Sequence, residues 1–117
     1  RMGFELGKNL FYVHGVGVDL DSYGSPSTDK HSVRAELGIS PSDVVVTCVA
    51  ELTKRKNQLF LLGAWKCLSQ KLSHAHLLLV GGGDGTALRE KVKRERISRV
   101  HFLGRRRDVP DVLQATD

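Results

Sequence analysis

Three short apolar runs alternate with longer stretches of helical periodicity in the second part of the chain. The runs read VVVTCV, AHLLLV and VHFL, and none of them alternates strictly between apolar and polar positions. Continuous apolar runs of this length are typical of strands that are covered on both faces, as in parallel sheets. We therefore predict buried strands at residues 44–49, 75–80 and 100–103.

A helical pattern follows each of these runs. A thin apolar stripe with a heavily charged outer face predicts a helix over 86–96. A further helix is predicted from Asp108, which can cap it, with Pro110 in the first turn. Between the first two strands, apolar residues recur at spacings of three and four. They predict a helix over 57–72 whose buried stripe consists of Leu61, Ala64, Trp65, Leu68 and Leu72.

This alternation of strands and helices predicts an α/β fold, a Rossmann-like parallel three-layer sandwich of which the chain holds a part. We expect residues 1–40 to form an interdomain connector, with a short edge strand at 10–14 and a helix near 32–37 that Gly38 closes. Residues 41–117 would form the first half of the domain. A half-sheet exposes an edge and apolar faces, so self-association is expected.

Composition narrows the class of protein. Hydrophobic content of 40% and charged content of 26% are ordinary for one globular domain. The chain has no long apolar run of transmembrane type and no recognisable signal peptide, so we expect a cytoplasmic location. Cys48 and Cys67 lack metal-site spacing and are expected to be buried free thiols, and the scattered histidines argue against a metal site.

The net charge of +5 is local in origin. Nine of the 18 Lys and Arg residues lie between Arg89 and Arg107, which favours anionic partners. Arg89, Lys93 and Arg96 share one face of a predicted helix, and this face is either simply solvated or suited to an acidic membrane or partner surface. Aromatic residues make up 6% of the chain and none is interleaved with the three arginines at 105–107, which argues against nucleic acid binding.

Candidate chemistry lies in the turns after the three strands, where parallel sheets bind ligands. Lys54, Arg55 and Lys56 precede a predicted helix whose free N–H groups favour an anion such as a diphosphate. A solvated basic turn is the other interpretation. The glycine-rich second turn fails the dinucleotide pattern G-x-G-x-x-G, because the sixth position from Gly81 is Thr86.

The order of these segments is more specific than any one of them. The succession GVGVDLDSY, VVVTCVAELTKRKNQ, AHLLLVGGGDG and VHFLGRRRDVPDVLQATD resembles the retaining glycosyltransferases of the GT-B fold. It is most similar to the "group one" family that builds capsular, exo- and lipopolysaccharides, and to members with a GEL…KN turn from exopolysaccharide clusters. The resemblance runs from about Val13 to Asp117 and implies the hinge and the first half of the C-terminal nucleotide-sugar-binding domain.

The resemblance also implies the site residues. Lys56 takes the position of a lysine that binds the donor diphosphate, and Arg55 would supply a second cation, because Glu51 stands where the family commonly has arginine. The family's acidic catalytic segment lies beyond residue 117, so no catalytic residue is expected within the chain. The resemblance also implies that the backbone of Gly81 and Gly83 faces the donor. It implies that Gly104 and Arg105 contact the nucleobase.

The function implied is transfer of a sugar, with retention, from a nucleotide-diphosphate-sugar donor to a glycan or lipid-linked acceptor in polysaccharide biosynthesis. The reaction would take place in the cytoplasm, at the inner face of the membrane, and this part of the enzyme alone would be inactive. No cofactor or metal is expected, because cations and helix N-termini can stabilise a departing diphosphate. Two alternatives stay open: a non-catalytic nucleotide-binding α/β domain and a basic nucleic-acid-binding module.

Overall fold

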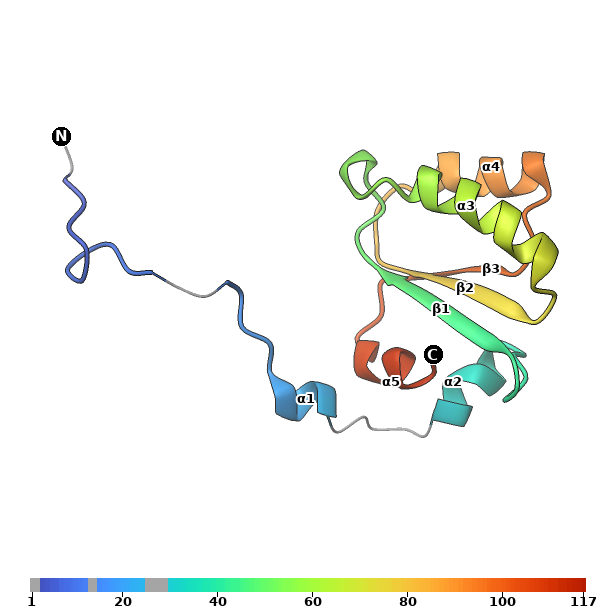
Figure 1. The fold of residues 1–117 in the computed structure, drawn as a ribbon, viewed down its shortest axis with the longest axis horizontal. Helices are drawn as coiled ribbons and strands as arrows, with labels where there is room; N and C mark the ends of the chain where they lie inside the picture. The colour runs from blue at the N-terminus through green and yellow to red at the C-terminus, as the bar shows by residue number, and fades with distance from the viewer. Residues whose placement is uncertain (1–2, 13–14, 25–29) are drawn as a thin grey trace.

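A computed structural model describes residues 3–12, 15–24 and 30–117. Within these residues the chain forms a three-stranded parallel sheet with helices on both faces (Figure 1). The strand order β1-β2-β3 places β2 in the centre. This arrangement confirms the predicted α/β, Rossmann-like fold. The elements are α1 (Leu20–Gly24), α2 (Lys30–Glu36), β1 (Val44–Val49), η1 (Lys54–Lys56), α3 (Gln58–Lys71), β2 (Ala75–Val80), α4 (Thr86–Glu95), β3 (Val100–Gly104) and α5 (Val109–Gln114).

The three strands lie where the apolar runs predict them. The bounds of β1 and β2 match the prediction, and β3 extends one residue further, to Gly104. In the central strand Leu77, Leu78 and Leu79 are each 1% exposed or less, so both faces of β2 are covered. A strand covered on both faces has no polar side, which explains why its sequence does not alternate.

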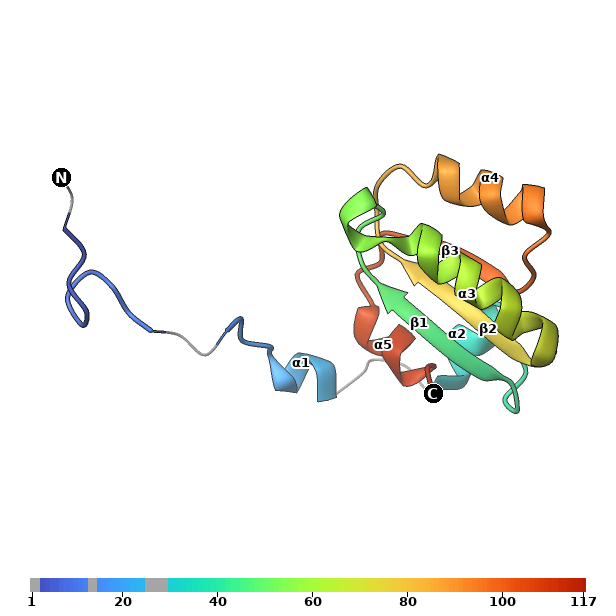
Figure 2. The ribbon, with the colours of Figure 1, turned by 45° about the horizontal axis from the view of Figure 1, so that its top comes forward.

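Two hydrophobic cores lie on opposite faces of the sheet (Figures 1 and 2). The first lies under α3 and α4, and the second lies between the sheet and the pair α2 and α5. Val33 and Ile39 are buried in the second core, so the packed unit includes residues that precede position 41. The first core contains Leu62, Trp65, Ala75, Leu77, Leu79, Leu88 and Ile97, and the second contains Val33, Ile39, Val45, Leu78, Val80, Val112 and Ala115.

The helix predicted over 57–72 is present as α3, but of the predicted buried stripe only Trp65 is fully buried. Leu61 and Leu72 are only partly buried, and Ala64 and Leu68 are exposed. Leucines occur on several sides of this helix, so apolar spacing alone fits more than one face. The face that is buried also carries polar residues, so the apolar pattern did not identify it. The residues that are buried are Gln58, Leu62, Trp65 and Ser69.

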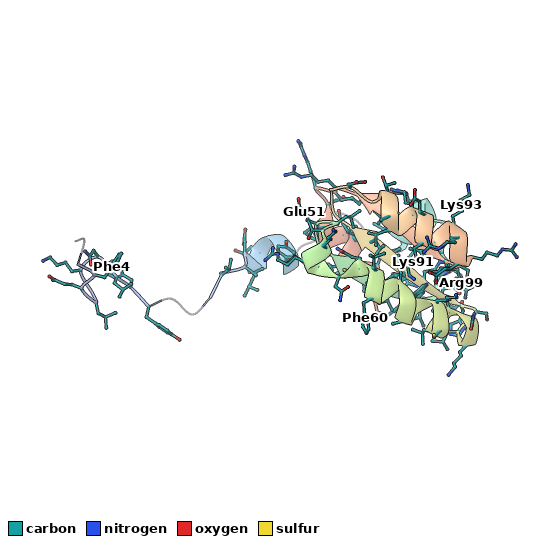
Figure 3. The ribbon with its side chains drawn as sticks, turned by 90° about the horizontal axis from the view of Figure 1, so that it is seen from above. Phe4, Glu51, Phe60, Lys91, Lys93 and Arg99 are labelled. Carbon is teal, nitrogen blue, oxygen red and sulfur yellow. The ribbon has the colours of Figure 1, made fainter. Side chains whose placement is uncertain are left out.

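The edge strand predicted at residues 10–14 is wrong for the described part of that segment. Leu10 forms an isolated bridge with Leu6, and residues 11 and 12 belong to no strand. Residues 13 and 14 lie outside the described residues. The side chains of residues 10–12 are at least 47% exposed, and no strand of the sheet pairs with them. Figure 3 shows Phe4, in the same segment, far from the packed helices.

Two short helices precede the sheet. The helix predicted near residues 32–37 is α2, and Gly38 follows it with a φ of 65°, which suits a glycine at a helix end. Helix α1 was not predicted. The Asp19 carboxylate accepts the Asp21 N–H at 3.1 Å at the start of α1, so a short-range capping signal was present in the sequence.

The cysteines and the helix lengths bear on two further expectations. Cys48 and Cys67 are both free, but Cys67 is exposed on α3, so the prediction that both are buried is wrong. Within the described ranges, no helix is both long enough and apolar enough to cross a membrane.

Candidate functional site

The turns that leave the three strands are joined to one another at the carboxyl edge of the sheet. The Leu52 N–H donates to the Gly82 carbonyl at 2.8 Å, and Leu52 pairs with Gly83 in a parallel bridge. The Gly81 N–H donates to the Gly104 carbonyl, also at 2.8 Å. Parallel pairing therefore continues past the strands, and the three predicted turns form one continuous surface.

The glycines of the second turn make this close contact possible. Gly81 has a φ of 153°, and a Cβ there would lie 2.0 Å from the Ala50 carbonyl oxygen. Gly83 has a φ of 113°, and a Cβ there would lie 2.8 Å from the Leu52 oxygen. Any side chain at these positions would push the first turn away. Gly81 and Gly83 therefore have a packing role, because they allow the first turn to lie close to the second.

The first turn has a defined backbone path. Lys54–Lys56 forms the 3-10 turn η1, and Asn57 then takes a left-handed conformation with a φ of 53° before α3 begins. The buried Gln58 donates its side-chain N–H to the Glu51 carbonyl at 2.9 Å. This bond ties the start of α3 to the end of β1. The three consecutive cations are therefore carried on a turn that is held at both ends.

The cations of this first turn are available to a ligand. The side chains of Lys54, Arg55 and Lys56 are exposed, and within the described part of the chain none of them has a hydrogen-bond or ion-pair partner. A free cation beside a helix N-terminus suits an anion, because the helix dipole and the first N–H groups add to the charge. Lys56 and Arg55 therefore lie on a turn whose side chains are free, and their role as anion ligands stays a prediction.

The arginines of the third turn divide into two kinds. Arg106 bonds to both oxygens of Glu36, at 2.8 and 3.1 Å, and to Asp108 at 2.6 Å. These bonds raise the pKa of the Arg106 guanidinium and lower the pKa of the Glu36 and Asp108 carboxyls. Arg105 and Arg107 are exposed, with no such partner among the described residues. Arg106 thus joins α2 to the third turn, and Arg105 is left free.

The predicted role of Asp108 as a side-chain cap is wrong. Its carboxylate accepts hydrogen bonds from Arg106, and no side-chain capping bond opens α5. The backbone carbonyl of Asp108 instead accepts the N–H groups of Asp111 and Val112. The arginine two residues upstream is the stronger partner for this carboxylate because both groups are charged.

A cavity of about 330 Å³ lies beside this edge, between the first turns of α3 and α4. None of the six residues predicted for the site lines it, but their neighbour Lys54 does. Sequence reasoning missed the contributions of Gln58 and Asp84. The Asp84 carboxylate accepts the Thr86 N–H, and the Thr86 side chain and then this N–H lower the pKa of Asp84. This Asp-Gly-Thr turn could have been recognised in the sequence. The lining residues are Leu52, Thr53, Lys54, Asn57, Gln58, Leu59, Asp84, Ala87 and Leu88.

The charged face of α4 is partly committed to packing. The Arg89 guanidinium carbon lies 4.3 Å from the centre of the Phe102 ring, a cation–π contact. Lys91 bonds to Glu95 at 2.6 Å, and Lys66 of α3 reaches the same carboxylate at 3.3 Å. Figure 3 shows Lys91 between α3 and α4, and Lys93 on the outer side of α4. Only part of the predicted basic face is therefore free.

A second cluster of ionisable groups lies near the amino ends of the strands. His76 Nδ1 lies 2.9 Å from His101 Nε2, and His76 Nε2 lies 3.2 Å from a carboxylate oxygen of Asp43. Burial, and then the charge of His76, lower the pKa of His101. Within the described residues, no group of three His, Cys, Asp or Glu side chains is placed to hold a metal ion.

The family model for "Glycosyl transferases group 1" matches residues 43–117, which contain the whole sheet and the carboxyl-edge turns. The chain belongs to this family. Its fold is similar to that of a solved structure, WaaG, described as a glycosyltransferase involved in lipopolysaccharide biosynthesis. The TM-score is 0.73 at 23% sequence identity, over 86% of this chain and 28% of that one. Comparison with curated proteins gave no match. The chain thus spans 28% of the length of the glycosyltransferase that it resembles in structure.

Proposed function

We propose that the chain forms part of the donor-binding domain of a glycosyltransferase. The enzyme would move a sugar from a nucleotide-diphosphate-sugar donor to a glycan or lipid-linked acceptor during polysaccharide biosynthesis. Membership of the group 1 family supports glycosyl transfer as the reaction. The chemistry of the carboxyl edge supports a diphosphate as the group that this part of the protein binds.

One observation carries the proposal. The cationic turn Lys54–Lys56 is exposed, has no protein partner among the described residues, and directly precedes the 14-residue helix α3. Three consecutive cations in so small a space repel one another. A diphosphate would offset this repulsion and gain charge-assisted hydrogen bonds.

Each predicted site residue has a role in this proposal. Lys56 and Arg55 bind the diphosphate and stabilise the charge that develops on it as the sugar departs. The backbone of Gly81 and Gly83 borders the donor, and a third pair, Gly104 and Arg105, contacts the base. These cations supply positive charge to the diphosphate, so we propose no metal for this step.

The acceptor, the stereochemistry and the location are further parts of the proposal. We propose transfer with retention, in exopolysaccharide or capsule synthesis, at the cytoplasmic face of the membrane. The exposed cations Lys93 and Arg96 on the outer side of α4 and at its end suit contact with acidic lipid headgroups.

The function is tested by nucleotide binding to the 117-residue chain, measured by calorimetry with UDP, ADP and GDP. The wild-type chain should bind at least one of them. The variant Lys56→Ala should bind that nucleotide about tenfold more weakly, as expected for loss of one charged hydrogen bond. Lys71→Ala is the matched control, because Lys71 is exposed at the far end of α3, and it should leave the affinity unchanged. Absence of binding, or equal affinity in Lys56→Ala, would contradict the proposal.

A further inference from the structure

Glu51 carries an exposed carboxylate at the carboxyl edge of the sheet, two residues after the end of β1 and three residues before the cationic turn (Figure 3). Within the described residues this carboxylate has no hydrogen-bond or ion-pair partner, although Lys54, Arg55 and Lys56 follow closely in the chain. A free acid only three residues before a proposed diphosphate-binding turn needs an explanation, because it repels the ligand that the neighbouring cations attract.

The backbone of Glu51 is held from both sides, so its side chain leaves the sheet from a fixed point. The preceding residue, Ala50, donates its N–H to Val80, and the following residue, Leu52, donates to Gly82, both at 2.8 Å. The Glu51 carbonyl accepts the side-chain N–H of Gln58 at 2.9 Å. The side chain of Gln58 is 2% exposed, so this bond is protected from water.

Other acids at this edge of the sheet have structural partners. Asp84 accepts the N–H of Thr86 and opens α4, and Asp108 bonds to Arg106. Glu51 has neither kind of contact. Of these three acids, Glu51 is therefore the one whose carboxylate is left for a ligand, alongside the free cations of the same turn.

A carboxylate is an acceptor only and binds neutral donors such as hydroxyl groups. A nucleotide sugar offers hydroxyls on its ribose and on its transferred sugar, next to the diphosphate. We propose that Glu51 accepts hydrogen bonds from hydroxyl groups of the donor and thereby selects ligands in which hydroxyls adjoin a diphosphate. This inference rests on the proposed donor-binding function and adds a specificity-determining residue to it.

The test compares Glu51→Ala and Glu51→Gln with the wild-type chain by calorimetry. The probes are pyrophosphate, the nucleoside diphosphate that binds best among UDP, ADP and GDP, its 2′,3′-dideoxy analogue, and the corresponding nucleotide-glucose. Glu90→Gln is the matched control, since Glu90 is exposed on α4 and has no partner among the described residues. Retained amide spectra would confirm that each variant is folded.

Glu51→Ala should weaken binding of the nucleoside diphosphate, of the nucleotide-glucose or of both about tenfold, while leaving pyrophosphate no weaker. If Glu51→Ala binds the dideoxy analogue as tightly as the wild-type chain does, the ribose hydroxyls are the partner of Glu51. A loss seen only with the nucleotide-glucose assigns the hydroxyls of the sugar. Equal or tighter binding of every probe to Glu51→Ala would overturn the inference, because Glu51 would then act by repulsion alone. Absence of nucleotide binding to the wild-type chain would instead refute the proposed function.

Discussion

The two ends of the parallel sheet use the same residue types in opposite ways. At the carboxyl end, Arg55, Lys56 and Arg105 are exposed and free of protein partners within the described residues. At the amino end, Arg34 and Arg99 are bonded to the protein itself. Figure 3 shows the two ends, with Glu51 at one and Arg99 at the other. The contrast indicates which charges hold the fold and which are available to bind a ligand.

The amino-end arginines bind backbone carbonyls. Arg34 is 3% exposed and donates to the carbonyls of Ser40, Pro41, Asp43 and Ala115, and to the Asp117 carboxylate at 2.7 Å. It thereby joins α2, the start of β1 and the end of α5. Arg99 donates to the carbonyls at the end of α3 and the start of β2, namely those of Ser69, Leu72 and Ala75.

The largest effect is expected at the amino end. Arg34→Met should lower the free energy of unfolding by about 3 kcal/mol or more, because it leaves buried carbonyls and a carboxylate without their donor. Urea denaturation of the 117-residue chain would measure this loss. The control, Arg55→Ala, should change stability by no more than about 0.5 kcal/mol, as is usual for a surface site. Similar stability changes in the two variants would contradict the distinction between the ends.

The fold was predictable because each strand is a continuous apolar run and the apolar residues of α3 and α4 recur at spacings of three and four. The details that failed depend on contacts distant in sequence. Leu62 rather than Leu61 is buried because α3 is rotated to place Gln58 against Glu51, and a glutamine gives no sign that it will be buried. Arg34 and Arg55 look alike in the sequence, and only the packing of α2 against α5 distinguishes them.

The candidate site was predictable in part for similar reasons. Topology requires the turns after the parallel strands to meet at one edge, so Lys56, Gly81 and Gly104 could be placed there from the strand order alone. The close approach that requires Gly81 and Gly83 could not be predicted, because it depends on the path of residues 50–52. Which of the three adjacent arginines is bound by the protein depends on the position of Glu36, 70 residues away from Arg106.

A smaller effect is expected from the histidine pair at the amino end. The pKa of His101 is below its usual 6.5, so the native state binds fewer protons near that pH than the unfolded chain does. The contribution of His101 to the stability of the fold should therefore be fully present above about pH 6.5. It should be lost as the pH drops from there through the lowered pKa of His101. The change of the urea midpoint between pH 7.5 and 5 would measure it.

His101→Gln should flatten this pH dependence, because the group that is neutral in the fold is removed. His74→Gln is the control, since His74 is exposed and should leave the slope as it is. An unchanged slope in His101→Gln would contradict the assignment of this effect to His101, whose ring lies 2.9 Å from that of His76.

The central claim is that ligand binding is confined to the carboxyl edge of the sheet. Amide chemical shifts of the 117-residue chain, recorded during titration with the nucleoside diphosphate that binds best, test it most directly. The account predicts shifts in residues 51–58, 81–86 and 104–107, with the amino-end residues 34–43 and 97–101 unchanged. Shifts centred on the amino end, or on the outer face of α4 alone, would contradict it.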